Sequence, residues 1–116
     1  MSLEQLLEHL NDQPEIIEFD AVQSIIEQHY QYEPASFTNG DVNNEAGTNE
    51  GSCKIFAFGA LNKLTKEQTL ACFGHYYREH VLANPEGNDH QNIRQFMEHG
   101  WDGVNFGTFP LTPASE

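Results

Sequence analysis

Apolar side chains recur at helical spacing along most of the chain and predict about five helices. The spacing predicts helices over residues 3–13, 16–30, 53–64, 65–82 and 90–99. Residues 53–64 are apolar on nearly every side, which predicts a central helix, with a buried strand over 54–58 as the alternative. Ser2, Ser52 and Asp89 are candidate N-caps, and Thr65 opens a capping box with Gln68.

The segments between these helices are polar or end at proline. Residues 35–51 are rich in asparagine and glycine, and a loop of this length indicates either a function or an ordered polar structure. Residues 30–33 are expected to be extended before Pro34, and residues 101–106 to form an extended tail whose Trp101 packs back on the helices. We therefore predict an all-α, irregular bundle of about five helices with at most a minor β element. Its single domain spans residues 1–106, and residues 107–116 are a loose tail.

The charge is concentrated in the first half of the chain. The 116 residues carry a net charge of −13, and residues 1–53 contain eleven acids and no Lys or Arg. Such a field repels phosphate backbones and anionic lipid, so binding to nucleic acid or a membrane surface is disfavoured. A solvated acidic surface is the simpler explanation, and attraction of a basic partner or a cation is the alternative.

From the N-terminus and the hydropathy we expect a protein that is made and kept in the cytoplasm. Acids are interspersed among the leucines of residues 1–8, and this segment has no basic region of the kind that begins a secretory signal peptide. No apolar run is long enough for a transmembrane helix.

The two cysteines, Cys53 and Cys72, lie inside apolar segments and are expected to be reduced and buried. Cys53 follows the candidate N-cap Ser52, so the helix dipole would lower the pKa of its thiol. With His90 as a general base, this gives an alternative function, a thiol-dependent hydrolase or transferase with Cys53 as nucleophile. Free cysteines mostly occupy cores, which favours the buried interpretation.

Neither a metal nor a cofactor is expected. Residues 39–50 place oxygen-bearing side chains at the spacing of a calcium loop and end on Glu50. The first position is Asn39 instead of aspartate, and Asn44 stands where the sharp turn needs glycine, so a turn-rich loop is the better interpretation. The spacing of the six histidines contains no zinc-site signature.

The leading hypothesis is a binding protein for an unidentified protein or small molecule. Its polar residues gather in 38–54 and 89–94, next to predicted helix N-termini, where free backbone N–H groups favour anionic ligands. The candidate binding residues are Thr38, Asn39, Asn49, Glu50, Ser52, Lys54, Asp89, Asn92, Arg94, Trp101 and Asp102. For Lys54 and Arg94 the simpler interpretation is a structural salt bridge.

Several segments carry a family resemblance. They are Phe37–Gly40, Ala46–Phe58, Gln68–Gly74, Tyr77–Arg78, Asp89–Arg94 and Gly100–Gly103. In this order and spacing they resemble the HopJ type III effector family. The resemblance implies membership of a family named after a type III secretion repertoire, and hence export by a type III secretion system as an alternative to the cytoplasm. It implies no enzymatic activity and assigns no catalytic residue. A leucine stripe that begins at Leu3 departs from a disordered, serine-rich secretion signal.

Overall fold

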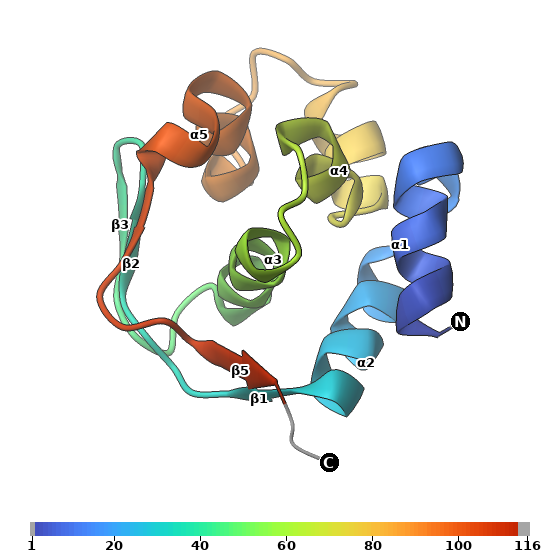
Figure 1. Cartoon of the computed structure of the whole chain (residues 1–116). Coiled ribbons are helices and arrows are strands. Elements are labelled where there is room, and N and C mark those ends of the chain that lie inside the picture. Colours follow the sequence, from blue (N-terminus) through green and yellow to red (C-terminus); the bar gives the residue numbers. More distant parts are fainter. Residues whose placement is uncertain (1, 114–116) are drawn as a thin grey trace.

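The computed structural model describes residues 2–113, which fold around one central helix, α3 (Figure 1). The helices are α1 (Leu3–Asp12), α2 (Phe19–His29), α3 (Glu50–Leu61), α4 (Lys66–Ala71) and α5 (Gln91–His99). Three short helices of other pitch join them: η1 (Pro14–Ile16), η2 (Tyr76–Val81) and η3 (Gly100–Gly103). The strands are β1 (Tyr30–Tyr32), β2 (Phe37–Asn39), β3 (Val42–Asn44), β4 (Val104–Phe106) and β5 (Leu111–Pro113).

The fold is mixed α/β, so the all-α prediction is wrong. Within residues 2–113, five short strands form two antiparallel sheets, with the orders β3-β2-β4 and β1-β5. The segment expected to be a long polar loop, residues 35–51, contains the β2–β3 hairpin, and β4 pairs with its other edge. Phe37 lies on the central strand of this sheet, where it is paired with Asn44 of β3 on one side and with Phe106 of β4 on the other.

The last described strand continues the fold beyond residue 106, where the sequence analysis placed the end of the domain. Leu111 lies opposite Tyr32 in the β1–β5 pair and is buried. Residues 30–33 are extended as expected, and their backbone groups pair with this strand. The expected loose tail therefore contains an ordered strand, while its residues 114–116 lie outside the described residues.

The helix that was predicted over residues 65–82 is interrupted in the structure. Its start is confirmed, because Thr65 and Gln68 form the capping box of α4. The α-helix ends at Ala71, and the chain turns at Gly74, whose φ is +60°. A Cβ at this position would lie 2.6 Å from the backbone N of Phe19, so glycine is required by both conformation and space. The remainder of the segment continues as η2.

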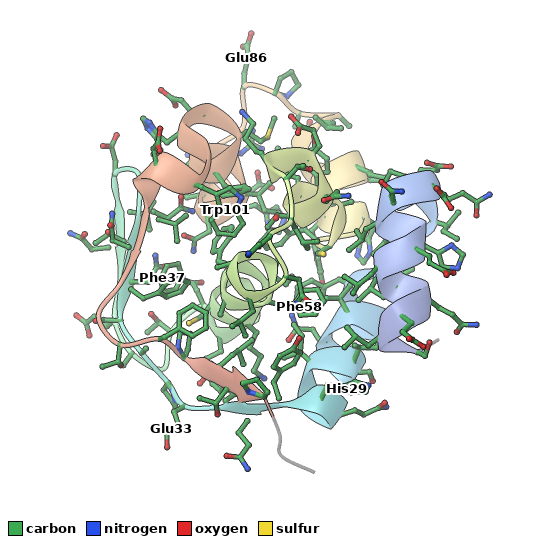
Figure 2. The ribbon with its side chains drawn as sticks, in the orientation of Figure 1. His29, Glu33, Phe37, Phe58, Glu86 and Trp101 are labelled. Atoms are coloured by element: carbon green, nitrogen blue, oxygen red, sulfur yellow. The ribbon has the colours of Figure 1, made fainter. Side chains whose placement is uncertain are left out.

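Aromatic rings surround α3 and form the core. The Phe56 ring packs against Phe37, Phe73 and Phe96, with ring centroids 6.0, 5.6 and 5.0 Å away. Trp101 packs on Phe96 and donates to the carbonyl of Leu64, which confirms that it docks on the bundle. Figure 2 shows Phe37, Phe58 and Trp101 pointing inward around α3, whereas Glu33 and Glu86 point outward. The interpretation of this segment as a central helix is confirmed and the strand alternative is excluded, but the helix spans Glu50–Leu61 instead of the predicted residues 53–64.

The helices of residues 2–113 are all too short or too polar to cross a membrane.

Candidate functional site

A pocket of about 420 Å³ opens between the starts of α3 and α5. Its lining comes from four parts of the chain that are far apart in sequence. The lining residues are Phe19, Val42, Asn49, Gly51, Ser52, Phe73, Tyr76, His90, Gln91, Asn92 and Ile93. The structure thus brings together the two polar segments, 38–54 and 89–94, that the sequence analysis singled out.

The start of α3 forms one wall. Its N-cap is Asn49 in the left-handed conformation, with φ 50°, and no side chain caps the helix. Ser52 was predicted to be the N-cap, but α3 begins two residues before it. The backbone N–H groups of Gly51 and Ser52 have no protein acceptor within residues 2–113, and both residues line the pocket. A Cβ on Gly51 would lie 2.8 Å from the Phe19 ring, so only glycine allows α3 to approach α2 this closely.

The start of α5 forms the second wall in the same way. His90 is its N-cap, with φ 50° and no side-chain cap bond, and the N–H groups of Gln91 and Asn92 find no acceptor in the described part of the chain. Asp89 was predicted to be this N-cap, but its carboxylate is held by Arg94, with Nη2–Oδ1 at 2.6 Å. Hydrogen bonding from Arg94 lowers the pKa of Asp89. The salt bridge expected for Arg94 is therefore present.

Four asparagines lock the hairpin to both helix starts. We call Asn39, Asn44, Asn49 and Asn92 the asparagine cluster. Asn92 Oδ1 accepts from Asn39 and Asn44 at 3.1 and 3.2 Å, and Asn44 Oδ1 accepts from Asn92 and Asn49 at 3.0 and 2.7 Å. Asn39, Asn44 and Asn92 are buried. These bonds between buried amides fix the pocket walls relative to one another, although Oδ1 of Asn39 has no partner within residues 2–113.

Aromatic side chains form the opposite wall. The Phe19 ring meets Tyr76 edge-on, with centroids 5.1 Å apart, and Tyr76 lies 5.4 Å from the His90 ring. Phe73 lies behind them and stacks on Phe19. One side of the pocket thus consists of aromatic rings, and the other offers hydrogen bonds from backbone and side-chain amides. This combination is common in small-molecule sites.

The remaining candidate residues lie away from the pocket. Glu50 accepts a hydrogen bond from the Tyr32 hydroxyl. Burial raises the pKa of Tyr32, and the neighbouring Cys53 and Glu50 raise it further. Lys54 lies over the Tyr32 ring, 4.8 Å from its centroid, instead of in the expected salt bridge. Thr38 is a strand residue of β2, Trp101 belongs to the core, and Asp102 is exposed on η3.

Cys53 is buried in the core, with 1% of its surface exposed. Its thiol points toward the carbonyl of Ala35, and burial raises the pKa of the Cys53 thiol. Among the hydrogen bonds of residues 2–113, none joins Cys53 to a histidine. This arrangement does not activate the thiol. The thiol hypothesis stays a prediction, and the alkylation rate of Cys53 as a function of pH would test it.

Residues 39–50 do not form a single calcium-type loop. The segment divides into the β2–β3 hairpin and a turn in which Thr48 donates to the carbonyl of Glu45. Within the described range, no group of three or more His, Cys, Asp or Glu side chains is arranged to hold a metal ion.

The aromatic half of the pocket was not predicted from the sequence. Phe19, Phe73 and Tyr76 have the spacing of ordinary core residues in their helices, and no local pattern marks them as pocket residues. Gly51 and Gln91 were missed as well, although both adjoin residues that were named. Their position close to the start of a predicted helix, next to several polar side chains, is the feature of the sequence that could have indicated them.

Comparison with known proteins identifies the family of this chain. The family model described as HopJ type III effector protein matches residues 3–111. The chain belongs to the HopJ family. A crystal structure of the unknown-function protein VPA0580 is 57% identical and has a TM-score of 0.96, with 98% of this chain and 95% of that chain covered. No curated protein matches the sequence. HopJ membership confirms the resemblance, and the structural relative adds no assigned activity.

Proposed function

We propose that this HopJ protein is a binding protein that holds a small molecule in the pocket between α3 and α5. The ligand presents a hydrogen-bond-accepting group, such as a carboxylate, to the backbone N–H groups of the two helix starts. Its apolar part packs against the aromatic wall of Phe19, Phe73 and Tyr76. The observation that supports this proposal most is one pocket of about 420 Å³ lined both by aromatic rings and by helix-start residues whose backbone N–H groups have no acceptor within residues 2–113.

The size and rigidity of the pocket support this proposal. Pockets that hold small molecules measure roughly 300–1,000 Å³ and combine apolar walls with a few placed polar groups. The asparagine cluster fixes the polar wall before any ligand arrives, which reduces the entropy cost of binding. The strongly acidic protein repels polyanions, so a small ligand with at most one acidic group fits better than a nucleic acid.

The test is a screen of small carboxylates and their neutral amide analogues by amide chemical shifts. A ligand is expected to shift the backbone amides of Gly51, Ser52, Gln91 and Asn92 together. Ser52→Leu fills the pocket and should abolish these shifts.

The matched control is Ser36→Leu, which adds the same side chain at an exposed site outside the pocket. Shifts that survive Ser52→Leu, or that Ser36→Leu removes equally, would contradict the proposal. A screen in which no carboxylate shifts any of the four amides would contradict it as well.

We also propose export through a type III secretion system, supported by the description of the HopJ family as type III effector proteins. The whole chain would be expressed with a small epitope tag at its C-terminus in a bacterium with an active type III system. Appearance in the medium only while the secretion ATPase is intact supports export. Equal amounts in the medium of the ATPase-deficient strain, or retention in both strains, would refute it.

A further inference from the structure

We infer that His80 and His90 together form a binding site for a divalent transition-metal ion, with Zn²⁺ the best-fitting ion. His80 Nδ1 and His90 Nε2 lie 3.2 Å apart. Two imidazole nitrogens on one tetrahedral Zn²⁺, each at about 2.0–2.1 Å, are about 3.3–3.4 Å apart. The observed separation therefore matches that of two ligands on one ion, and a rotation of the two rings directs both lone pairs at the ion. The inference goes beyond the proposed function, because His80 is not among the residues that line the pocket.

The alternative use of this pair is a hydrogen bond between the two rings. A separation of 3.2 Å is at the long end of the range for an N–H donor. Such a bond needs a proton on one of the two nitrogens and a lone pair on the other. Metal binding needs lone pairs on both, which a neutral imidazole supplies by moving its proton to its other ring nitrogen. The two states therefore differ by one tautomer change and by the ion.

The two rings come from different elements and are held from several sides. His80 is on η2, and Asn84 donates to its backbone carbonyl. His90 is the N-cap of α5, where its backbone conformation is fixed. The Tyr76 ring packs against both imidazoles, with ring centroids 5.4 Å away in each case. A site whose ligands are already placed costs less to order when the ion binds.

Asp89 supplies the negative charge beside the pair. Arg94 holds Oδ1 of this carboxylate, while Oδ2 lies 3.9 Å from His90 Nε2. At this distance Oδ2 can accept a hydrogen bond from a water on the ion, a role that carboxylates commonly fill around bound metals. Residues 2–113 provide no complete set of three protein ligands here, so water occupies the remaining positions. The affinity is accordingly lower than that of a structural zinc site, and imidazole ligands also accept Cu²⁺ and Ni²⁺.

The test is a calorimetric titration of the full chain with Zn²⁺ alone, followed by imidazole ¹⁵N spectra. We expect one ion per chain and changes confined to His80 and His90. His80→Ala and His90→Ala should each weaken the affinity by about tenfold or more, and Asp89→Asn by a smaller factor. The affinity should also fall as the pH is lowered, because the ligands must be unprotonated.

The control is His29→Ala, a histidine at the end of α2, which should leave the affinity unchanged. The melting temperature of each variant verifies that the fold is intact. Binding by the wild type that is no tighter than binding by the double variant His80→Ala/His90→Ala would overturn the inference. An equal loss in His29→Ala would overturn it too. Ser52→Leu, which blocks the pocket, should still bind Zn²⁺, so this site and the proposed ligand site can fail separately.

Discussion

Two pairs of helices in this fold begin in two different ways. The helices α1 and α4 start at Ser2 and Thr65, whose hydroxyls accept from the N3 backbone N–H in complete capping boxes. The helices α3 and α5 start at Asn49 and His90, both left-handed with φ 50° and neither with a side-chain cap. The first pair lies outside the pocket lining, and the second pair forms the polar wall of the pocket.

The comparison shows that order at the pocket does not come from helix capping. A cap consumes the N–H groups that would otherwise be free at a helix start. At α3 and α5 these groups are left over, and the asparagine cluster holds the helix ends in place through buried side-chain amides. Local sequence therefore stabilises the starts of α1 and α4, whereas contacts between distant segments stabilise the pocket.

The largest effect is expected for Asn92→Ala, which breaks the asparagine cluster. The side chain of Asn92 accepts a hydrogen bond from Asn39 and exchanges hydrogen bonds with Asn44, and its loss leaves buried amide atoms without partners. We expect a loss of about 2–3 kcal/mol in the free energy of unfolding, measured by urea denaturation. Asn105→Ala, at an exposed position of β4, should change it by less than about 0.5 kcal/mol. Similar losses in the two variants would mean that the cluster does not hold the pocket.

The same contrast explains what could be predicted from the sequence. The capping box of α4 is local, because Thr65 and Gln68 suffice to define it. Ser52 and Asp89 look like caps in sequence, but the true starts depend on left-handed backbone at Asn49 and on Arg94, which takes the carboxylate of Asp89. Neither condition is visible in a short window.

The pairing of the strands and the aromatic side of the pocket could not be predicted, for related reasons. Each strand has three residues, which is too short for an alternating pattern to be recognised. Phe37 pairs with Phe106, and nothing near either residue indicates the other. His80 and His90 are separated by a turn and meet only in the folded chain. The apolar stripes of the helices, by contrast, predicted the helical core and the burial of both cysteines.

The next effect tests the scaffold side of the comparison. Thr65→Ala removes the side-chain bond to the Gln68 N–H and should cost about 1 kcal/mol in unfolding free energy. Ser52→Ala is the matched variant, because Ser52 resembles a cap in sequence but makes no cap bond, and it should cost less than about 0.5 kcal/mol. If Ser52→Ala proved as costly as Thr65→Ala, the two kinds of helix start would not differ.

A smaller effect isolates the backbone at the start of α5. His90→Gly and His90→Ala both remove the imidazole, so their difference reports the left-handed conformation alone. The glycine variant should be more stable than the alanine variant by about 1 kcal/mol, since alanine is strained at positive φ. At the exposed helix position Glu8 the order should reverse, with glycine less stable than alanine by up to about 1 kcal/mol. Thermal unfolding of the four variants measures both differences, and the same order at both positions would contradict the interpretation.

The smallest effect is the acid sensitivity of the Asp89–Arg94 pair. Arg94 lowers the pKa of Asp89 in the folded state, so the pair stabilises the protein above the ordinary carboxyl pKa. This contribution is lost as the pH falls through the lowered pKa and the carboxylate is protonated. Asp89→Asn should therefore have a lower melting temperature than the wild type at pH 6, and the gap should narrow toward pH 3. Because Asp89 is exposed, the gap should be small and should shrink further in high salt. No gap at any pH would mean that Arg94 stabilises the start of α5 through the carbonyls of Asn84 and Asp89, which Asp89→Asn keeps, instead of through the charge.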